Sequence, residues 1–397
     1  MVGVPRAHPA APPDRHHPLL TRPPHSLVPL TGPPEEHPLR RPRHAEPPPV
    51  VRPPGRQRLV LDVDTGIDDS LALLYAAAHP DVDLVAVTTC AGNVDVDQVV
   101  HNTLGVLELA GRPDVEVARG AAHPVGRALE TTPETHGPTG TGHAVLSPAG
   151  SASPRTAVQL LVEEARRTPG EITLVTMGPL SNLAAAVLAE PDLPLLLRDV
   201  WVMGGTFAQA GNVHPRVEWN VHVDPEAVRI VLHQWSSATP RGAVPLTMMG
   251  LDVTETSIIR AADLVEASRA AGLDPAVEGL TDAEVMTTPL GSPVLDFARD
   301  ALRFYFEFHD LYDGFYGAHV HDPFVVGAAL DPGLVRASPT VVDVELGGQW
   351  TTGETIADWR GHFDKPVNAY VATAGDGAAY IRRLVASLAD LARGAAG

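Results

Sequence analysis

Residues 62–69 place four carboxylates within eight positions, in the segment DVDTGIDD. The apolar run 59–61 precedes them, so the segment reads as a strand end followed by a glycine turn, at the carboxyl edge where open α/β sheets build their sites. Like charges this close repel one another unless a cation joins them or some stay protonated. Hard oxygen ligands suit Ca²⁺ or Mg²⁺ better than Zn²⁺. We therefore predict a divalent ion with chemistry beside it; a helix-capping role for Asp68 or Asp69 would explain only one or two of the acids.

Other polar segments offer groups that the same chemistry would use. Asn93 follows a glycine at the end of an apolar run, where it is either a turn residue or a hydrogen-bonding partner for a sugar hydroxyl. The loop 211–220 combines amide and carboxylate side chains, as polyol-binding sites do. They are Asn212, Glu218 and Asn220. The pair His321-Asp322 is either a helix cap or a proton-donating imidazole beside a carboxylate ligand for the ion.

Strand-like and helix-like patterns alternate from Arg58 onward, which predicts an α/β fold with an open, mostly parallel central sheet and helices on both faces. The connections 120–153 and 204–222 exceed ordinary loop lengths, which indicates functional loops. The expected strands are Arg58–Asp64, Val82–Thr89, Glu116–Ala118, Glu171–Thr176, Val200–Met203, Val244–Met248, Val341–Val344 and Asn368–Thr373. The expected helices are Asp68–Ala78, Asp95–Ala110, Leu180–Ala189, an aromatic-rich helix over Phe304–Tyr316, and Gly377–Ala392.

Composition limits the class of protein. Of the 397 residues, 44% are hydrophobic, and no apolar run approaches the roughly 18 residues that a membrane helix needs, so we expect a cytoplasmic globular protein without a membrane partner. The formal charge of −19 argues against nonspecific binding to nucleic acid or anionic membranes. The single cysteine, Cys90, excludes an internal disulfide and is expected to be a buried, inert thiol. Residues 1–57, rich in Pro, Arg and His, are expected to be a disordered extension to a domain at 58–397.

Taken in order, five motifs resemble those of the inosine–uridine preferring nucleoside hydrolase family. They are DTGIDD at 64–69, AGN at 91–93, MGPLSN at 177–182, the loop from GN at 211–212 to EWN at 218–220, and HDP at 321–323. LDVT at 251–254 is a softer match. Each motif alone is a weak signal, but their order and spacing fit from about residue 58 to the C-terminus.

The resemblance implies an enzyme that releases a free base and ribose from a ribonucleoside, its small-molecule partner, and that assembles as a homodimer or homotetramer. It implies a Ca²⁺ ion with three carboxylate ligands and one backbone carbonyl, where Met stands at a position that is often Thr. These ligands are Asp64, Asp69, Asp322 and the carbonyl of Met177. The implied ribose-binding set is Asp68, Asn93, Asn212, Glu218 and Asn220.

The catalytic roles follow from the same resemblance. Asp64 would act as the general base that takes a proton from the attacking water, and nearby carboxylates would stabilise positive charge on the ribosyl ring. His321 stands where the family's leaving-group acid would lie. His136 resembles a loop histidine of the family, and is either a substrate contact or an ordinary loop residue.

The residues that would bind the base are the hardest part of the site to predict from the sequence. Residues 304–320 offer several rings that could stack on a base or hydrogen-bond to it: Tyr305, His309, Tyr312, Tyr316 and His319. Of these, Tyr312 and Tyr316 are the candidates, although an aromatic stripe at helical spacing also fits core packing. The purine or pyrimidine preference stays open, and the stretch 272–300 departs from a compact family core.

Two other functions compete with hydrolysis of nucleosides. The segment at 62–66 superficially resembles a haloacid-dehalogenase-type phosphatase, but the only lysine, Lys365, lies close to the C-terminus and the loop 211–220 would have no role. The other is a nucleoside- or ribose-binding protein that has lost catalysis, against which the presence of all the catalytic positions counts.

Overall fold

The computed structural model of the chain describes residues 56–394, and these all belong to one compact unit. The prediction of a disordered extension over 1–57 falls almost entirely outside the described residues. Gln57 is described and opens the first strand. The division into an extension and a domain at 58–397 therefore stays a prediction.

An eight-stranded sheet lies at the centre of the described part, in the order β3-β2-β1-β4-β5-β6-β12-β9. All neighbouring pairs are parallel except β12 and β9, so the predicted α/β class with an open, mostly parallel sheet is confirmed. The strands are β1 Gln57–Val63, β2 Val82–Thr89, β3 Glu116–Arg119, β4 Ile172–Thr176, β5 Asp199–Met203, β6 Leu246–Met249, β9 Val335–Thr340 and β12 Ala369–Gly375.

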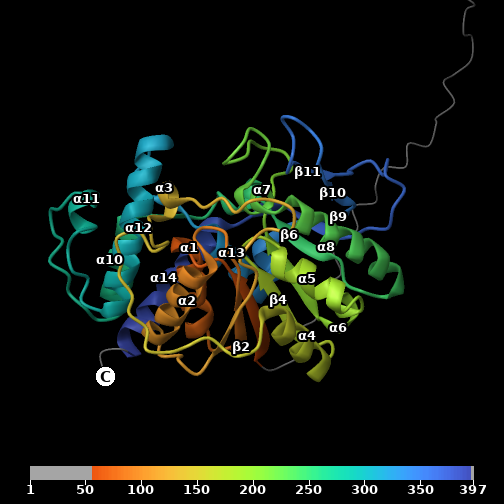
Figure 1. Cartoon of the computed structure of the whole chain (residues 1–397). Helices are drawn as coiled ribbons and strands as arrows, with labels where there is room; N and C mark the ends of the chain where they lie inside the picture. Colours follow the sequence, from red (N-terminus) through yellow and green to blue (C-terminus); the bar gives the residue numbers. More distant parts are fainter. Residues whose placement is uncertain (1–55, 395–397) are drawn as a thin grey trace, which may run out of the picture. The chain divides into compact units, whose positions relative to one another are not determined.

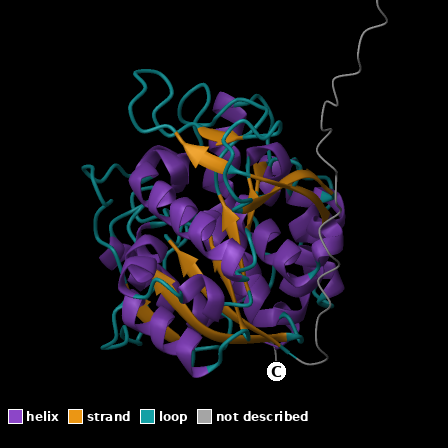
Figure 2. Ribbon diagram, turned by 90° about the vertical axis from the view of Figure 1, so that its right-hand side faces the viewer, coloured by secondary structure: helices purple, strands orange, loops and turns teal. Residues whose placement is uncertain are grey.

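Helices cover both faces of the sheet, because strands buried on both sides carry apolar side chains toward each face (Figures 1 and 2). In β1, Leu59 and Leu61 belong to one buried cluster and Val60 to the other. The helices of the first face are α1 Ile67–Ala78, α2 Val96–Leu109, α10 Ala261–Ala270, α12 Pro293–Tyr312, α13 His321–Leu330 and α14 Gly377–Gly394. Those of the second are α4 Ala157–Arg167, α5 Ser181–Ala189 and α8 Pro225–Ala238.

Short elements occupy the connections. Both long connections contain a helix of one turn or slightly more, so neither is a structureless loop. These elements are α3 Pro133–His136, α6 Leu193–Leu196, α7 Trp219–Val223, α9 Leu251–Thr254 and α11 Asp282–Val285, the 3₁₀ turns Thr239–Arg241 and Pro332–Leu334, and the small strands β7 Ile258–Ile259, β8 Ala318–His319, β10 Val342–Val344 and β11 Thr355–Ala357.

Two predicted elements differ from the structure. The strand expected at 341–344 exists as β10, but it pairs with β11 in a separate antiparallel ribbon, while the unpredicted β9 forms the edge of the central sheet. The helix expected over 304–316 is the end of α12, which begins at Pro293 and stops at Tyr312, because the following Asp-Gly turn has Gly314 at φ 72°.

The strand order reverses between β1 and β4, with β2 and β3 on one side and β5 and β6 on the other. Open α/β sheets bind ligands in the crevice outside the carboxyl ends of the strands at such a switch point. The segments that follow β1, β2, β4 and β5 carry Asp64, Asn93, Met177 and the loop to Glu218. The fold therefore gathers most of the motifs at one edge.

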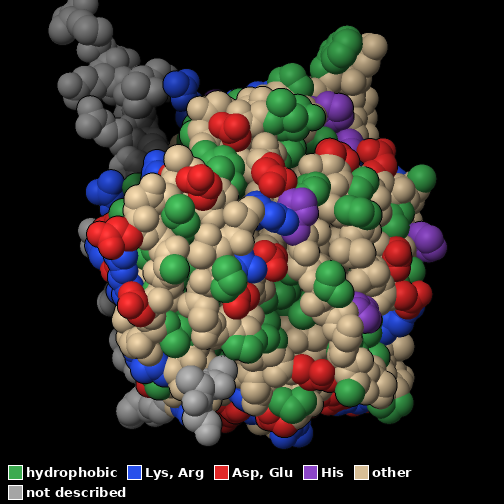
Figure 3. All heavy atoms as spheres, turned by 90° about the vertical axis from the view of Figure 1, so that its left-hand side faces the viewer, with side chains coloured by type: hydrophobic (Ala, Val, Ile, Leu, Met, Phe, Trp, Pro, Cys, Tyr) green, Lys and Arg blue, Asp and Glu red, His purple; other side chains and the backbone are tan. Residues whose placement is uncertain are grey.

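Among residues 56–394, no helix has the length and apolar character to cross a bilayer. On the face shown in Figure 3, acidic, basic, histidine and hydrophobic side chains are interspersed. Cys90 is buried and unbridged, as predicted.

Candidate active site

Three acids from two helix starts form the centre of the site. Asp68 and Asp69 lie in the first turn of α1, and Asp322 lies in the first turn of α13, which packs against α1. One carboxylate oxygen from each lies within 4.8 Å of the others, and all three residues are buried. Asp69 also caps α1, because its oxygens accept hydrogen bonds from the amides of Gly66 (2.8 Å) and Asp64 (3.2 Å). Helix capping therefore accounts for Asp69, in line with the expectation that it would explain only one or two of the acids. The other acids need another role.

Asp64 lies beside this cluster and is held by only one of its oxygens. Its Oδ2 accepts a hydrogen bond from the amide of Asn93 at 2.8 Å, whereas its buried Oδ1 has no partner within residues 56–394. The carboxylate is enclosed by two glycines: a Cβ on Gly92 would overlap it, and one on Gly178 would lie 2.9 Å from Oδ1. The glycines of both motifs therefore allow this close approach, and Asp64 keeps one oxygen free in a fixed orientation.

Burial and mutual repulsion raise the pKa values of these acids. Burial raises the pKa of Asp64 and of Asp322 well above the usual value, and in both cases neighbouring aspartates raise it further. Burial and the charge of Asp69 raise the pKa of Asp68 to about 7, although backbone hydrogen bonds, including those from Asp322 and His321, lower it in part. In the absence of a cation, the cluster therefore resists full ionisation.

This donor set fits a hard divalent cation. Every side chain of the cluster presents carboxylate oxygens, and the free Oδ1 of Asp64 lies nearby, which suits Ca²⁺ or Mg²⁺. The carbonyl oxygen of Met177, after β4, accepts a 2.6 Å hydrogen bond from Asn220. Met177 and two of the three acids, Asp68 and Asp322, line one cavity, which is described below. The group of three acids includes Asp68 where the sequence prediction has Asp64, and the predicted ligand set of Asp64, Asp69, Met177 and Asp322 stays a prediction.

The loop after β5 supplies one carboxylate and two amide side chains, which differ in how many of their hydrogen-bonding atoms are already used by the protein. Glu218 is the N-cap of α7, and its oxygens accept hydrogen bonds from three backbone amides, so much of its accepting capacity serves the loop. Burial raises its pKa to about 7. Asn220 donates to Met177, which leaves its side-chain oxygen as an acceptor. Asn212 is exposed and its oxygen accepts from the amide of Trp219 at 3.0 Å.

Two buried histidines, His136 and His321, lie beside the acids and come from distant parts of the sequence. The Nδ1 of His136 accepts a 3.0 Å hydrogen bond from the amide of Ile67, so its proton is on Nε2, and burial lowers its pKa to about 3. The Nδ1 of His321 lies 2.9 Å from the hydroxyl of Thr254. Burial, and then the neighbouring histidines, hold the pKa of His321 well below its usual value. To donate a hydrogen bond from Nε2, the neutral ring needs the tautomer in which Thr254 donates to Nδ1; a leaving-group acid would need the imidazolium, which the lowered pKa disfavours.

A cavity of about 800 Å³ joins these groups. Most of the predicted site residues line it, together with rings from α12 and the segment that follows it. The first group comprises Asp68, Asn93, His136, Met177, Asn212, Glu218, Asn220, His321 and Asp322. The second comprises Tyr305, Phe308, His309, Tyr312, Phe315 and His319. Asp64 and Asp69 lie behind this wall, against Asn93 and Gly66.

The two candidate base-pocket residues, Tyr312 and Tyr316, differ in whether they line the cavity. Tyr312 lines the cavity, and 65% of it is exposed. Tyr316 packs edge to face against Phe306, with ring centroids 5.4 Å apart, and does not line the cavity. His309 and Tyr305, which sequence reasoning did not single out, do line it. The spacing of His309 and Asp313, four residues apart on a helix, is a signal that could have indicated their contact.

A supporting contact also escaped sequence reasoning. Asn182, in the MGPLSN motif, donates to the Oδ1 of Asp62 at 2.8 Å and to the carbonyl of Thr89 at 2.9 Å. Thr88 donates to the same Oδ1 at 2.5 Å. Asp62 is buried at the end of β1, and burial raises its pKa to about 6. The motif therefore ties together the strand ends that carry Asp64 and Asn93.

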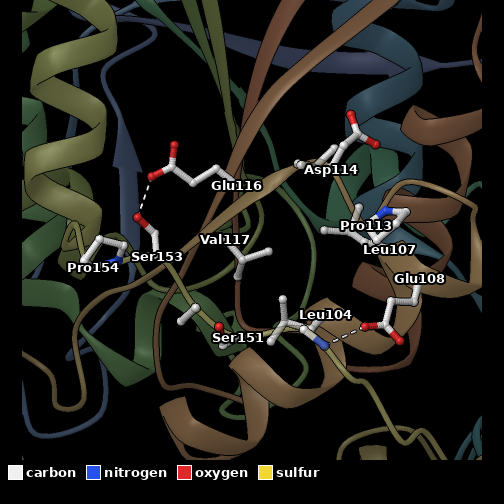
Figure 4. Close-up of a pocket in the computed structure, with 13 residues that line it drawn as sticks. Leu104, Leu107, Glu108, Pro113, Asp114, Glu116, Val117, Ser151, Ser153 and Pro154 are labelled. Atoms are coloured by element: carbon white, nitrogen blue, oxygen red, sulfur yellow. Dashed lines mark hydrogen bonds between the residues drawn. The ribbon is translucent and has the colours of Figure 1, made fainter.

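A second cavity, of about 390 Å³, lies between the end of α2, β3 and the segment 150–154 (Figure 4). Its carboxylates are already occupied. Glu116 accepts from Ser153 at 2.5 Å and from Arg155, while Glu108 accepts from the amide of Gly150 at 2.7 Å. These contacts fasten the long connection to the domain.

Comparisons with known proteins agree with this geometry. The sequence model described as inosine-uridine preferring nucleoside hydrolase matches residues 59–382. A pyrimidine-specific ribonucleoside hydrolase RihA from Shewanella sp. (strain ANA-3) is 35% identical over 333 residues, which cover 83% of this chain and 96% of the relative. Its counterpart in Salmonella paratyphi B is 33% identical over 76% of this chain and 88% of its own length.

Solved structures show the same relationship. A purine-preferring ribonucleoside hydrolase from Gardnerella vaginalis superposes with a TM-score of 0.74 at 28% identity, over 85% of this chain and 99% of the other. An inosine-guanosine nucleoside hydrolase gives a TM-score of 0.69 at 26% identity, over 85% and 98%. The resemblance found in the motifs is thus confirmed across most of the chain, which belongs to the inosine–uridine preferring nucleoside hydrolase family.

Proposed function

We propose that this protein hydrolyses the N-glycosidic bond of ribonucleosides in a Ca²⁺-dependent reaction that yields a free base and ribose. The observation that carries the proposal is the shared cavity, which is lined by a buried carboxylate cluster and amide side chains and also by aromatic and imidazole rings. A ribonucleoside combines matching parts, a polyhydroxylated sugar joined to a flat heterocycle. Family membership supports the reaction class.

Asp64, Asp69 and Asp322, together with the carbonyl of Met177, would hold the ion. When bound, a Ca²⁺ ion supplies charge that lowers the pKa of water and orients hydroxyl groups. The role of Asp64 follows from its contacts. Its Oδ2 is anchored by the amide of Asn93, so the free Oδ1 is the atom that accepts a proton from the attacking water.

The remaining side chains position the sugar and the leaving group. Asp68, Asn93, Asn212 and Asn220 line the cavity and bind ribose hydroxyls, while Glu218 contributes mainly by fixing the loop that carries Asn220. Negative charge on the acids stabilises the positive charge that develops on the ribosyl ring. The predicted leaving-group acid His321 would have to be an imidazolium, which its lowered pKa disfavours, so the neutral ring donates a hydrogen bond from Nε2 to the departing base, with Thr254 orienting it. His136 contacts the substrate.

Several finer expectations belong to this proposal. Pyrimidine ribonucleosides are the first substrates to test, because relatives at 33–35% identity bear that name. Salvage of bases, a place in the cytoplasm and a homodimeric or homotetrameric assembly complete the expected picture. A phosphatase is not supported, since the only lysine, Lys365, pairs with Asp343 at 3.0 Å and does not line the catalytic cavity.

The test is to incubate the purified full chain and Ca²⁺ with uridine, cytidine, inosine or a phosphomonoester, in buffer free of phosphate. We expect release of free base and reducing sugar in equal amounts, and no phosphate. Asp64→Asn should abolish the release, whereas Asp97→Asn, on an exposed side chain paired with Arg119, should not. Binding of nucleoside without turnover would instead identify the inactive binding protein, and release of phosphate would identify the phosphatase.

A further inference from the structure

His309 is buried in the wall of the catalytic cavity and has an acidic partner. It lies in the last turn of α12 and is 5% exposed. Its Nδ1 lies 2.6 Å from the Oδ2 of Asp313, at the C-cap position one helical turn further along the chain. A carboxylate can only accept a hydrogen bond, so this contact places the ring proton on Nδ1.

The other ring nitrogen has no partner. The Nε2 of His309 is buried and makes no hydrogen bond to any group in residues 56–394. Aromatic packing fixes the ring plane: Tyr305 lies with its centroid 5.0 Å away at 34°, and Phe315 is stacked at 5.3 Å and 26°. His319 meets the ring edge to face at 5.2 Å. A buried polar atom that is held rigidly without a partner costs stability. A ligand that hydrogen-bonds to Nε2 would explain why the protein leaves this atom without a partner.

The protonation state of the ring defines what that ligand must offer. Burial lowers the pKa of His309, Asp313 opposes this, and His319 lowers the pKa further, with a net shift below the usual value. At neutral pH the imidazole is therefore uncharged, with its one proton on Nδ1 and a lone pair on Nε2. The Nε2 atom is therefore a hydrogen-bond acceptor to which no group in residues 56–394 donates.

We propose that His309 is a specificity-determining residue whose Nε2 accepts a hydrogen bond from a ring N–H flanked by a carbonyl on the substrate base, and that Asp313 positions it. The inference rests on the proposed function. The N3–H of uracil is such a donor, as is the N1–H of hypoxanthine. The location supports a contact to the base, because His309 lines the same cavity as the acids and lies among the rings of Tyr305, Phe315 and His319.

The experiment compares three ribosides that share the sugar: uridine, 3-methyluridine, which lacks the N–H, and p-nitrophenyl riboside, whose leaving group needs neither the contact nor a proton. The wild-type protein should prefer uridine to 3-methyluridine by about 10- to 100-fold in kcat/KM. His309→Phe keeps a ring between Tyr305 and Phe315. It should lower kcat/KM for uridine by about the same factor, and leave the other two ribosides within about threefold.

Asp313→Asn provides a second variant, on a side chain that is 48% exposed and so is tolerant of substitution. An amide can donate to Nδ1 and move the ring proton to Nε2, which would turn the acceptor into a donor. We expect the same selective loss with uridine. His233→Phe is the matched control, because this half-exposed histidine of α8 lies outside the cavity, and all three rates should persist.

The outcomes separate this inference from the proposed function. If His309→Phe slows all three ribosides equally, or keeps the discrimination between uridine and 3-methyluridine, His309 only packs the wall and the inference is overturned while nucleoside hydrolysis stands. If the wild-type protein releases ribose from none of the three, the proposed function fails and takes the inference with it.

Discussion

Addition of Ca²⁺ to chelator-treated protein should raise its melting temperature, because the buried acids repel one another without a cation. Asp68, Asp69 and Asp322 each present an oxygen within 4.8 Å of the others, and the free oxygen of Asp64 lies beside them. Burial, and then the charges of neighbouring aspartates, raise the pKa values of Asp64, Asp68 and Asp322. A cation that binds only the folded state removes this repulsion and stabilises that state.

The size of the shift follows from mass action. An ion present at 100 times its dissociation constant stabilises the fold by about 2.7 kcal/mol. Residues 56–394 give about 340 ordered positions, and unfolding entropy of about 2.1 cal/mol/K per residue sums to roughly 0.7 kcal/mol/K. Dividing the stabilisation by this entropy predicts an increase in melting temperature of about 4 °C.

The assay is differential scanning calorimetry or fluorimetry after EGTA treatment, with and without excess Ca²⁺. Asp322→Asn removes one charge of the cluster at nearly constant volume, so it should raise the melting temperature of the ion-free protein and reduce the Ca²⁺ shift to below about 1 °C. Asp97→Asn, exposed and paired with Arg119, should keep the full shift. An equal Ca²⁺ shift in wild type and Asp322→Asn would refute an ion at this cluster.

Three further predictions concern single residues. Asp64→Asn should lower kcat by about 10²–10⁴-fold, as expected for loss of a general base, while the protein still unfolds cooperatively, and a rate near wild type in a ribose-release assay would contradict that role. Gly92→Ala should lower kcat and cost about 1–3 kcal/mol in urea unfolding, because the new Cβ would overlap the carboxylate of Asp64, whereas Gly126→Ala, with 3.3 Å to its nearest neighbour, should cost less. His136 has a folded pKa of about 3 against 6.5 unfolded, so the folded state binds fewer protons and the stability present above pH 6.5 is lost as pH falls toward 3. Between pH 7 and 5 the wild type should therefore lose about 2 kcal/mol more than His136→Phe in urea unfolding, and parallel losses would show that His136 is not buried and neutral.

The acidic part of the site was predictable because its residues stand at strand ends. Alternating strand and helix patterns indicate a parallel sheet, and a parallel sheet brings its carboxyl ends to one edge. Asp64 and Asn93 follow β1 and β2, which are neighbours, and their contact of 2.8 Å is the direct result. A glycine in each motif, Gly66 two residues after Asp64 and Gly92 directly before Asn93, was a further local signal, since both turns need close approach of a neighbouring side chain.

Long-range pairing limited the prediction elsewhere. β9 contains Arg336 and Pro339, and most of its residues are only half-buried, so it carries little of the apolar alternation that identifies a strand. An edge position explains both features, because an edge strand tolerates proline. β10 has the alternation, but only three residues, and its partner β11 is equally short. Which of the two segments joins the central sheet depends on packing that no local pattern records.

The acids and the rings of the site differ in how strongly the fold determines their positions. Backbone amides hold Asp64, Asp69 and Glu218, so the strand ends themselves fix the geometry. Of the rings, Tyr305, Phe308, His309 and Tyr312 stand on α12, whose last turn is partly exposed, with Tyr312 at 65%, and Phe315 and His319 follow it. Substitutions there remove little buried area and leave the sheet intact. Selection among bases could therefore change through α12 while the proposed ion site and ribose contacts keep their places, so the choice of base was the part that strand-end motifs could not predict.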